Sequence, residues 1–155
     1  MRLILTLLIL TLVGGSYAQQ NTWVTKSPHG GGKLERSVGF SIAGKGYIAT
    51  GQDTANLVVT SNWEYSPSSN SWAQKADLPG VGRRNAIAFT IGNTGYVGTG
   101  MSAADSNMGN TLDDMWAYSP GTNSWAARAP FPGGAGNGIY FATAFTLDSK
   151  GYICC

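Results

Sequence analysis

The sequence predicts an all-β protein made of repeated antiparallel sheets, from its composition, its internal repeats and the alternation within each repeat. Of 155 residues, 22 are glycine and only 12% are charged, against about 25% charged in an average soluble protein. Much glycine together with many aromatic residues is typical of short strands joined by tight turns. The formal charge of +2 is spread along the chain, so nucleic-acid binding is not expected.

The first 18 residues are expected to be a secretory signal peptide. Arg2 precedes an apolar run over residues 3–13, and Ser16 and Ala18 place small side chains at the −3 and −1 positions of a cleavage site. The run is shorter than the roughly 20 residues that cross a bilayer. We therefore expect a secreted, periplasmic or cell-surface protein with no membrane span after cleavage.

Two blocks of sequence recur in residues 19–155. Residues 63–80 match residues 116–133 at 11 of 18 positions, at a shift of 53 residues. Residues 37–51 recur as residues 86–100 at a shift of 49, and their pattern returns at 141–153. A period near 50 residues indicates an array in which each unit is one supersecondary element. The expected units cover residues 21–34, 35–79, 84–132 and 139–155.

Each complete unit is expected to hold four short strands. In the second complete unit, alternating apolar residues predict strands over 86–91, 95–100, 114–119 and 124–127. The intervening residues 92–94, 101–111 and 120–123 are rich in turn-forming types, and Pro67 and Pro120 fall in turns. Four antiparallel strands in each unit are the blade of a β-propeller.

These motifs resemble the kelch repeat, a family of β-propeller proteins. The strand pattern Gly-Tyr-x-x-Thr-Gly and the later tyrosine and tryptophan positions occur twice, and the resemblance covers essentially residues 19–155. It implies a kelch-type propeller in which Thr50 and Thr99 replace the first glycine of the usual doublet. The repeat positions are Gly46, Tyr47, Gly51, Trp63, Tyr65, Trp72, Gly95, Tyr96, Gly100, Asp114, Trp116, Tyr118 and Trp125.

The chain is too short for a closed propeller. A ring needs about four to eight blades, and 137 residues after cleavage supply fewer than three units of about 50 residues. We expect a partial propeller with an incomplete ring. It is interpreted as a fragment of a longer protein, with ring closure by oligomerisation as the alternative.

No catalytic, metal or cofactor site is predicted. The single histidine, His29, lies in a His-Gly-Gly-Gly string, but the chain has no Gly-x-Ser-x-Gly elbow, and we expect a solvated loop histidine. Kelch-type copper-radical oxidases need several imidazole and tyrosine ligands, which are missing here. Asp113 and Asp114 are neighbours, so their carboxylates should point to opposite faces, and one is expected to bind backbone amides of the turn. The adjacent Cys154 and Cys155 are expected to be free thiols.

Arg36 and Arg84 are the candidate ligand-binding residues. Each precedes the innermost strand of its unit, where kelch proteins place an arginine near the mouth of the central channel. Several arginines at one mouth would suit carboxylates, whereas the alternative is a structural arginine packed on a neighbouring blade.

The function expected from these observations is non-catalytic binding of a protein or glycan partner, without a cofactor. The alternative that the resemblance allows is a kelch-type enzyme on an acidic sugar, similar to a sialic-acid epimerase. We further expect Trp116→Ala and Trp125→Ala to destabilise the fold, and Arg84→Ala to leave stability nearly unchanged.

Overall fold

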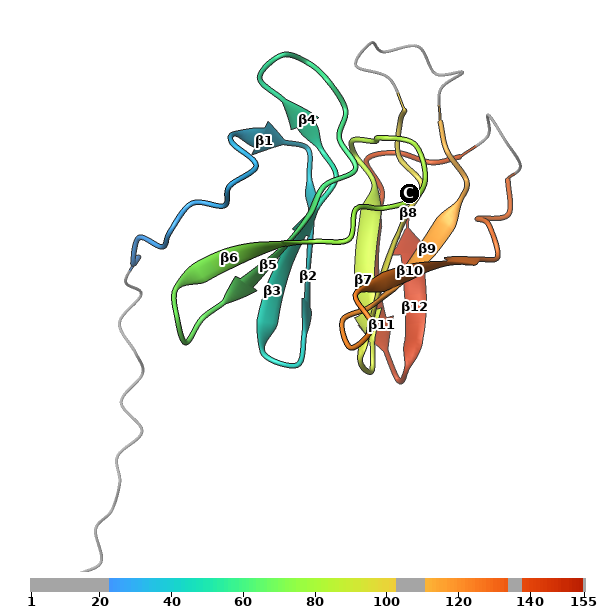
Figure 1. Cartoon of the computed structure of the whole chain (residues 1–155). Helices are drawn as coiled ribbons and strands as arrows, with labels where there is room; N and C mark the ends of the chain where they lie inside the picture. Colours follow the sequence, from blue (N-terminus) through green and yellow to red (C-terminus); the bar gives the residue numbers. More distant parts are fainter. Residues whose placement is uncertain (1–22, 103–110, 134–137, 155) are drawn as a thin grey trace, which may run out of the picture.

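The computed structural model describes residues 23–102, 111–133 and 138–154, and every regular element in these ranges is a β-strand (Figure 1). The expected all-β fold is confirmed, while the expected signal peptide lies outside the described residues. The strands are β1 (Leu34–Glu35), β2 (Val38–Ile42), β3 (Lys45–Ala49), β4 (Gln52–Asp53), β5 (Asn62–Ser66), β6 (Ser71–Lys75), β7 (Ile87–Ile91), β8 (Thr94–Gly98), β9 (Met115–Ser119), β10 (Ser124–Arg128), β11 (Thr143–Leu147) and β12 (Lys150–Cys154).

The strands form two four-stranded antiparallel sheets and two smaller ones. The order β2-β3-β5-β6 defines blade 1, and β7-β8-β9-β10 defines blade 2. Strands β11 and β12 pair only with each other among the described residues and are called the terminal hairpin, while β1 pairs with β4 at one end of blade 1. Figure 1 shows the sheets side by side with no closed ring. The predicted four strands per unit are therefore confirmed.

Tight turns set the register of the first two strands in each unit. Ala43 and Gly44 join β2 to β3, and Asp148 and Ser149 join β11 to β12, in both cases with two consecutive positive φ angles. Such paired angles match the right-handed twist of the flanking strands. In blade 2 the turn is one residue shorter than expected, because Thr94 pairs with Ile91 and begins β8.

Blades pack through an aromatic ring of one blade against a strand glycine of the next, which we call the ring–glycine contact. Phe40 on β2 lies where a Cβ on Gly95 of β8 would stand, and Phe89 on β7 lies in the same way against Gly151 of β12. Only glycine leaves room for the ring at this distance. In the second and third copies of the Gly-Tyr motif, at Gly95 and Gly151, the glycine is thus explained by the neighbouring blade and not by its own strand.

A polar contact, which we call the inter-blade clasp, joins the outer strands. The indole Nε1 of Trp125 donates to the carbonyl of Ala76 at the end of blade 1, at 2.8 Å. The backbone N–H of Ala76 donates to Oδ1 of Asn123 at 2.9 Å, and the Tyr118 hydroxyl donates to the same oxygen at 2.9 Å. Asn123 has a φ of 48°, a left-handed conformation that asparagine tolerates well.

The same clasp holds the N-terminal segment on blade 1. Trp72 Nε1 donates to the carbonyl of Ser27 at 2.7 Å, and the Ser27 N–H donates to Oδ1 of Asn70 at 3.1 Å. The Tyr65 hydroxyl also donates to Asn70, at 2.9 Å. Ser27 therefore occupies, relative to blade 1, the place that Ala76 occupies relative to blade 2.

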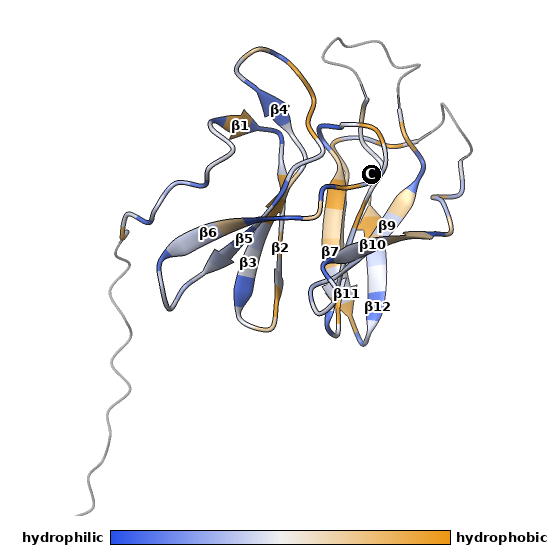
Figure 2. Ribbon diagram, viewed as in Figure 1, coloured by the Kyte–Doolittle hydropathy of each residue, from blue (hydrophilic) through white to orange (hydrophobic). Residues whose placement is uncertain are grey.

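The hydrophobic core lies between the blades. Ala49, Leu78, Ala86 and Val97 form a buried cluster to which both blades contribute. Partly buried rings pack against it from both sides, including Phe40, Trp116 and Trp125. Figure 2 shows apolar residues concentrated on β7 and its neighbours at this junction. Phe40, Trp116 and Trp125 thus pack between the blades.

Candidate functional site

The two candidate arginines occupy different positions in the repeat. Arg36, Asn85 and Phe141 are equivalent, with φ angles of 58°, 53° and 56°, whereas Arg84 is equivalent to Glu35. Arg36 and Arg84 are therefore not two copies of one repeat position. The first blocks of the two units align at a shift of 49 residues, and Arg36 and Arg84 are 48 apart.

The side chains of Arg36 and Arg84 nevertheless meet at one acceptor. Arg36 Nη1 lies 3.3 Å and Arg84 Nη1 3.4 Å from Oε1 of Gln52, which is the first residue of β4. The Gln52 amide is buried and fixed in orientation, because its Nε2 donates to the carbonyl of Asn56 at 3.2 Å. Two positive side chains thus converge on a neutral amide oxygen, which we call the arginine pair.

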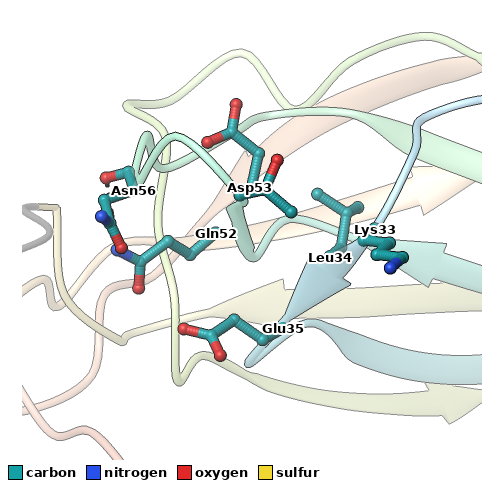
Figure 3. A pocket seen from close by; sticks show the side chains of 7 residues that line it. Lys33, Leu34, Glu35, Gln52, Asp53 and Asn56 are labelled. Carbon is teal, nitrogen blue, oxygen red and sulfur yellow. Dashed lines mark hydrogen bonds between the residues drawn. The ribbon is translucent and has the colours of Figure 1, made fainter.

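A hollow of about 380 Å³ has Gln52 in its lining, whereas Arg36 and Arg84 do not line it. Figure 3 shows that side chains from β1 and from the segment starting at β4 surround it. Glu35 lies at the junction, since its Oε1 is 3.5 Å from Nε of Arg36 and its side chain is exposed. The hollow is lined by Lys33, Leu34, Glu35, Gln52, Asp53, Thr54 and Asn56.

Arg84 is a structural residue as well as a candidate ligand residue. It is only 5% exposed, and its backbone pairs with Met101 in both directions at 3.0 Å. Truncating a buried arginine leaves its aliphatic volume unfilled and removes a donor from Gln52. This burial revises the expectation that Arg84→Ala leaves stability nearly unchanged. Arg36, which is more exposed, is the better residue for testing ligand binding.

The sequence analysis missed an ion pair between a buried arginine and a half-buried aspartate, next in sequence to Arg84. Arg83 is fully buried and its guanidinium binds both carboxylate oxygens of Asp114, with Nη2 2.7 Å from Oδ2. Asp114 also accepts from Trp116 Nε1 at 2.7 Å. Burial alone would raise the pKa of Asp114, but its hydrogen bonds to Arg83 and Trp116 hold that pKa below its ordinary value.

This pair also corrects the partners expected for Asp114. Side chains, and not the backbone amides of the turn alone, are its main partners. Both members of the pair are replaced in the other repeat. The residues of blade 1 equivalent to Arg83 and Asp114 are Leu34 and Ser61. That joint difference is the signal from which the sequence could have indicated the pair.

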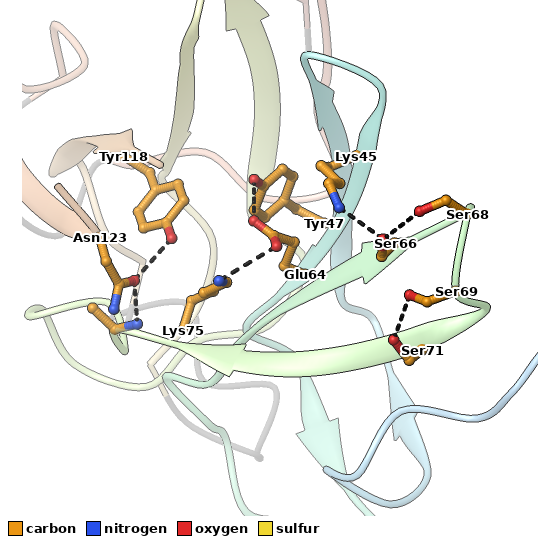
Figure 4. A network of polar contacts seen from close by, with 11 residues as sticks. Lys45, Tyr47, Glu64, Ser66, Ser68, Ser69, Ser71, Lys75, Tyr118 and Asn123 are labelled. Atoms are coloured by element: carbon orange, nitrogen blue, oxygen red, sulfur yellow. Dashed lines mark hydrogen bonds and ion pairs between the residues drawn. The ribbon is translucent and has the colours of Figure 1, made fainter. Parts of the chain in front are cut away.

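A second polar network fills the junction of the two blades on the side of Tyr47 (Figure 4). The Tyr47 hydroxyl donates to Glu64 at 2.6 Å, and Glu64 lies 3.3 Å from Nζ of Lys75. Burial and the nearby Glu64 raise the pKa of Tyr47 well above its ordinary range. Burial, followed by the charge of Glu64, raises the pKa of Tyr118 to about 12. Both tyrosines therefore remain neutral hydrogen-bond donors near pH 7.

The remaining predicted residues lie in scaffold positions. His29 is half-buried and not simply solvated, because its ring is 5.7 Å from that of Trp63 and 5.6 Å from that of Trp72, and its Nδ1 accepts from Gly31 N–H. Cys154 is exposed with a free thiol, and Cys155 lies outside the described residues. The repeat positions lie on β3 (Gly46, Tyr47), β5 (Trp63, Tyr65), β6 (Trp72), β8 (Gly95, Tyr96), β9 (Trp116, Tyr118) and β10 (Trp125), or flank a strand (Gly51, Gly100, Asp114).

Within the described ranges, no group of three or more His, Cys, Asp or Glu side chains could hold a metal ion. The same ranges contain no helix of the length and hydropathy that crossing a membrane requires.

Stacked, four-stranded antiparallel sheets that follow one another along the chain define a β-propeller arrangement of blades. Among solved structures, the fold is similar to one described as "Structure of YjhT", with a TM-score of 0.73 and 17% sequence identity. The match covers 88% of this chain and 48% of that one, so this chain spans about half the length of its neighbour. No family model and no curated protein matches the sequence.

Proposed function

We propose that this chain is an exported, kelch-type propeller protein that binds an acidic group of a protein or glycan partner, without catalysing a reaction. The observation that carries the proposal is the arginine pair, in which Arg36 and Arg84 converge on Gln52, and Gln52 in turn lines a hollow. A volume of about 380 Å³ falls within the range of roughly 300–1,000 Å³ that is usual for small-ligand sites.

The ligand chemistry follows from the guanidinium groups. Arginine presents a planar set of donors that fits a carboxylate, and two such groups close together favour an anion strongly. Glu35 is the competitor, since its exposed carboxylate already lies near Arg36. A bound carboxylate would therefore displace the Glu35 side chain into solvent, where its charge is well solvated.

The experiment compares an acidic with a neutral glycan on the full chain. Sialyllactose should bind and lactose should not, measured by calorimetric titration. Arg36→Ala should weaken sialyllactose binding more than tenfold, because it removes one charge-assisted contact. Glu35→Gln should strengthen it several-fold, and Arg128→Ala, at an exposed site on β10, is the matched control. Equal binding of both glycans, or binding indifferent to Arg36 and Glu35, would refute the acidic-group site.

The second candidate is an enzyme acting on an acidic sugar, which the same convergence of cationic groups supports. Its test is an NMR assay of sialic acid mutarotation and epimerisation by the full chain, with Arg36→Ala as the comparison. Turnover that is lost in this variant would favour the enzyme, whereas binding without turnover would favour the binding module.

Export is the remaining part of the proposal and rests on residues 1–18. Expression of the full chain in a secreting host, followed by N-terminal sequencing of the released protein, should give a first residue of Gln19. Retention of an uncleaved chain inside the cell would contradict it.

A further inference from the structure

Three stacked pairs of aromatic rings recur at the same positions of successive units. Phe40 stacks on Tyr47 with ring centroids 5.0 Å apart, and Phe89 stacks on Tyr96 at 5.0 Å. The third pair, Phe145 and Tyr152 of the terminal hairpin, stacks at 5.3 Å. The terminal hairpin therefore presents the same surface that β2 and β3 present in blade 1.

Two of these pairs are covered by the next unit and the third is not. The rings of Phe40 and Phe89 form the ring–glycine contacts with Gly95 and Gly151. Phe145 is 47% exposed, and Tyr152 is 41% exposed whereas its equivalent Tyr47 is 3% exposed. Leu147 is 55% exposed, whereas its equivalent in blade 1, Ile42, is 2% exposed. The apolar face of the terminal hairpin is thus formed but unpartnered in the described structure.

The opposite end of the molecule carries the matching half of the contact. Gly46 of β3 is the equivalent of Gly95 and Gly151, and a Cβ on Gly46 would meet only Tyr65 of its own blade, at 3.7 Å. Val97 and Tyr118 on this face of blade 2 are fully buried, whereas their equivalents in blade 1, Ile48 and Tyr65, are only half-buried.

Part of the face of blade 1 is already covered by the N-terminal segment, and the part left open matches the terminal hairpin. Residues 27–31 cover the outer strands of blade 1, through the clasp at Ser27 and the contacts of Gly30 and Gly31 with Trp63. No such contact is made at Gly46, on the inner strand β3. The terminal hairpin is equivalent to the two inner strands of a blade, so it fits the open part without displacing residues 27–31.

We propose that a second copy of this chain docks its terminal hairpin on the open face of blade 1, with Phe145 of one copy against Gly46 of the other. Such an interface continues the ring–glycine contact that the chain already makes twice internally. It is heterologous, since a different surface of each copy takes part, and a head-to-tail contact that closes after two copies makes a ring. Two copies together span nearly the length of the YjhT chain, of which one copy covers 48%.

The first test is the concentration dependence of the molecular mass of the full chain, by sedimentation equilibrium. The chain should dimerise, and Phe145→Lys should raise the dissociation constant more than tenfold by placing a charge against the apolar socket at Gly46. Phe141→Lys is the matched control, because Phe141 is 72% exposed, close in sequence, and outside the three ring pairs. Both variants keep residues 1–22, so association through that segment would be unaffected by either.

The second test distinguishes a head-to-tail interface from a symmetric one. Gly46→Glu should also abolish the dimer while remaining folded, since a Cβ at Gly46 makes only an ordinary contact with Tyr65, at 3.7 Å. Mixing Phe145→Lys with Gly46→Glu should restore a dimer, because one interface is then wild-type and the other pairs a lysine with a glutamate. Circular dichroism of each variant checks that it is folded.

Three outcomes would overturn the proposal. These are a monomer at the highest concentration measured, a dimer that is indifferent to Phe145→Lys, and a mixture of the two variants that stays monomeric while both are folded. A monomer that binds a separately produced set of further blades would identify those blades, and not a second copy, as the occupant.

Discussion

At the scale of single residues, the two arginines that follow one another in sequence have different roles. Arg83 is enclosed and satisfied by Asp114, whereas Arg84 points to Gln52 together with Arg36. Trp116 is held by Asp114, while Trp63, its equivalent in blade 1, has a buried Nε1 with no partner among the described residues. The ion pair of Arg83 and Asp114 is therefore a feature of blade 2 and not of the repeat.

The first prediction concerns this pair. Asp114→Asn should cost about 1–3 kcal/mol of unfolding free energy, because it leaves the buried Arg83 guanidinium without a counter-charge, while the 35% exposure of the Asp114 side chain lets water screen part of the loss. The double variant Arg83→Leu with Asp114→Ser copies the residues of blade 1 and should recover at least half of that loss. Urea denaturation measures both. If the double variant is less stable than Asp114→Asn alone, the pair is required and not merely tolerated.

The second prediction concerns Glu64 and acid. Burial tends to raise the pKa of Glu64, but the hydrogen bonds from Tyr47 and Lys75 and the charge of Lys75 outweigh it, so the pKa lies below its ordinary value. Its stabilising contribution is then complete above the unfolded pKa, which is about 4.3, and is lost as the pH falls through the lower folded pKa. Glu64→Gln should therefore weaken the dependence of unfolding free energy on pH between about pH 5 and 3.

The control for this acid dependence is Asp148→Asn, at an exposed turn of the terminal hairpin. Asp114 responds in the same direction as Glu64, so the Glu64 variant should keep part of the slope. A Glu64→Gln slope identical to that of the wild type would show that this network does not stabilise the folded state.

At the scale of strands, the contacts between blades determine which residues recur. Gly95 recurs because a neighbouring ring lies against it, and Trp125 recurs because its indole binds the previous blade. The alternation of apolar residues predicted the strands well, since it depends only on local order along the chain. It could not show which strand face meets which blade, because those contacts join residues about 50 positions apart.

The third prediction tests the ring–glycine contact. Gly95→Ala should cost about 1–3 kcal/mol, because the added methyl group overlaps the Phe40 ring. The double variant Gly95→Ala with Phe40→Ala should cost clearly less than the sum of the costs of the two single variants. Gly121→Ala is the control, since nothing lies near its Cβ position. Thermal unfolding followed by circular dichroism gives all four values, and additive costs would contradict the contact.

The fourth prediction separates the packing of Trp125 from its hydrogen bond. Trp125→Ala should cost about 3–5 kcal/mol, as expected for a packed indole. Trp125→Phe keeps an aromatic ring in the packed site and should cost less, about 1–2 kcal/mol, because it loses the bond to the Ala76 carbonyl and part of the indole volume. Trp116→Ala should resemble Trp125→Ala. Equal costs of the alanine and phenylalanine variants of Trp125 would assign its role to the hydrogen bond.

At the scale of the whole molecule, burial decreases from the junction of the blades toward both ends. Val97 and Tyr118 of blade 2 are fully buried, whereas Phe145 and Leu147 are about half exposed. The repeats in the sequence predicted the incomplete ring, because blade count follows from length. The arginine pair could be predicted only in part, since it is built from Arg36 and Arg84 at different repeat positions and depends on how Gln52 is oriented.

The fifth prediction is a gradient of hydrogen exchange along the molecule. Amides of β8, which pairs on both sides within a four-stranded sheet, should exchange more slowly than those of β12, which pairs only with β11 in a two-stranded sheet of the described structure. Exchange monitored by NMR, at a protein concentration below the dissociation constant of the dimer, measures this gradient. Uniform protection across β3, β8 and β12 would indicate that the sheets unfold as one cooperative unit.

Each blade contacts the next blade through an aromatic ring and the previous blade through a glycine. The contact surfaces of one unit are therefore equivalent to those of its neighbours. Phe40 meets Gly95 in the same way that Phe89 meets Gly151. Duplication or deletion of one full period would therefore create only blade-to-blade contacts of a kind that the chain already makes. Tandem duplication in the gene could lengthen such a protein in steps of one blade, and homologous chains should differ in length by whole periods of about 50 residues.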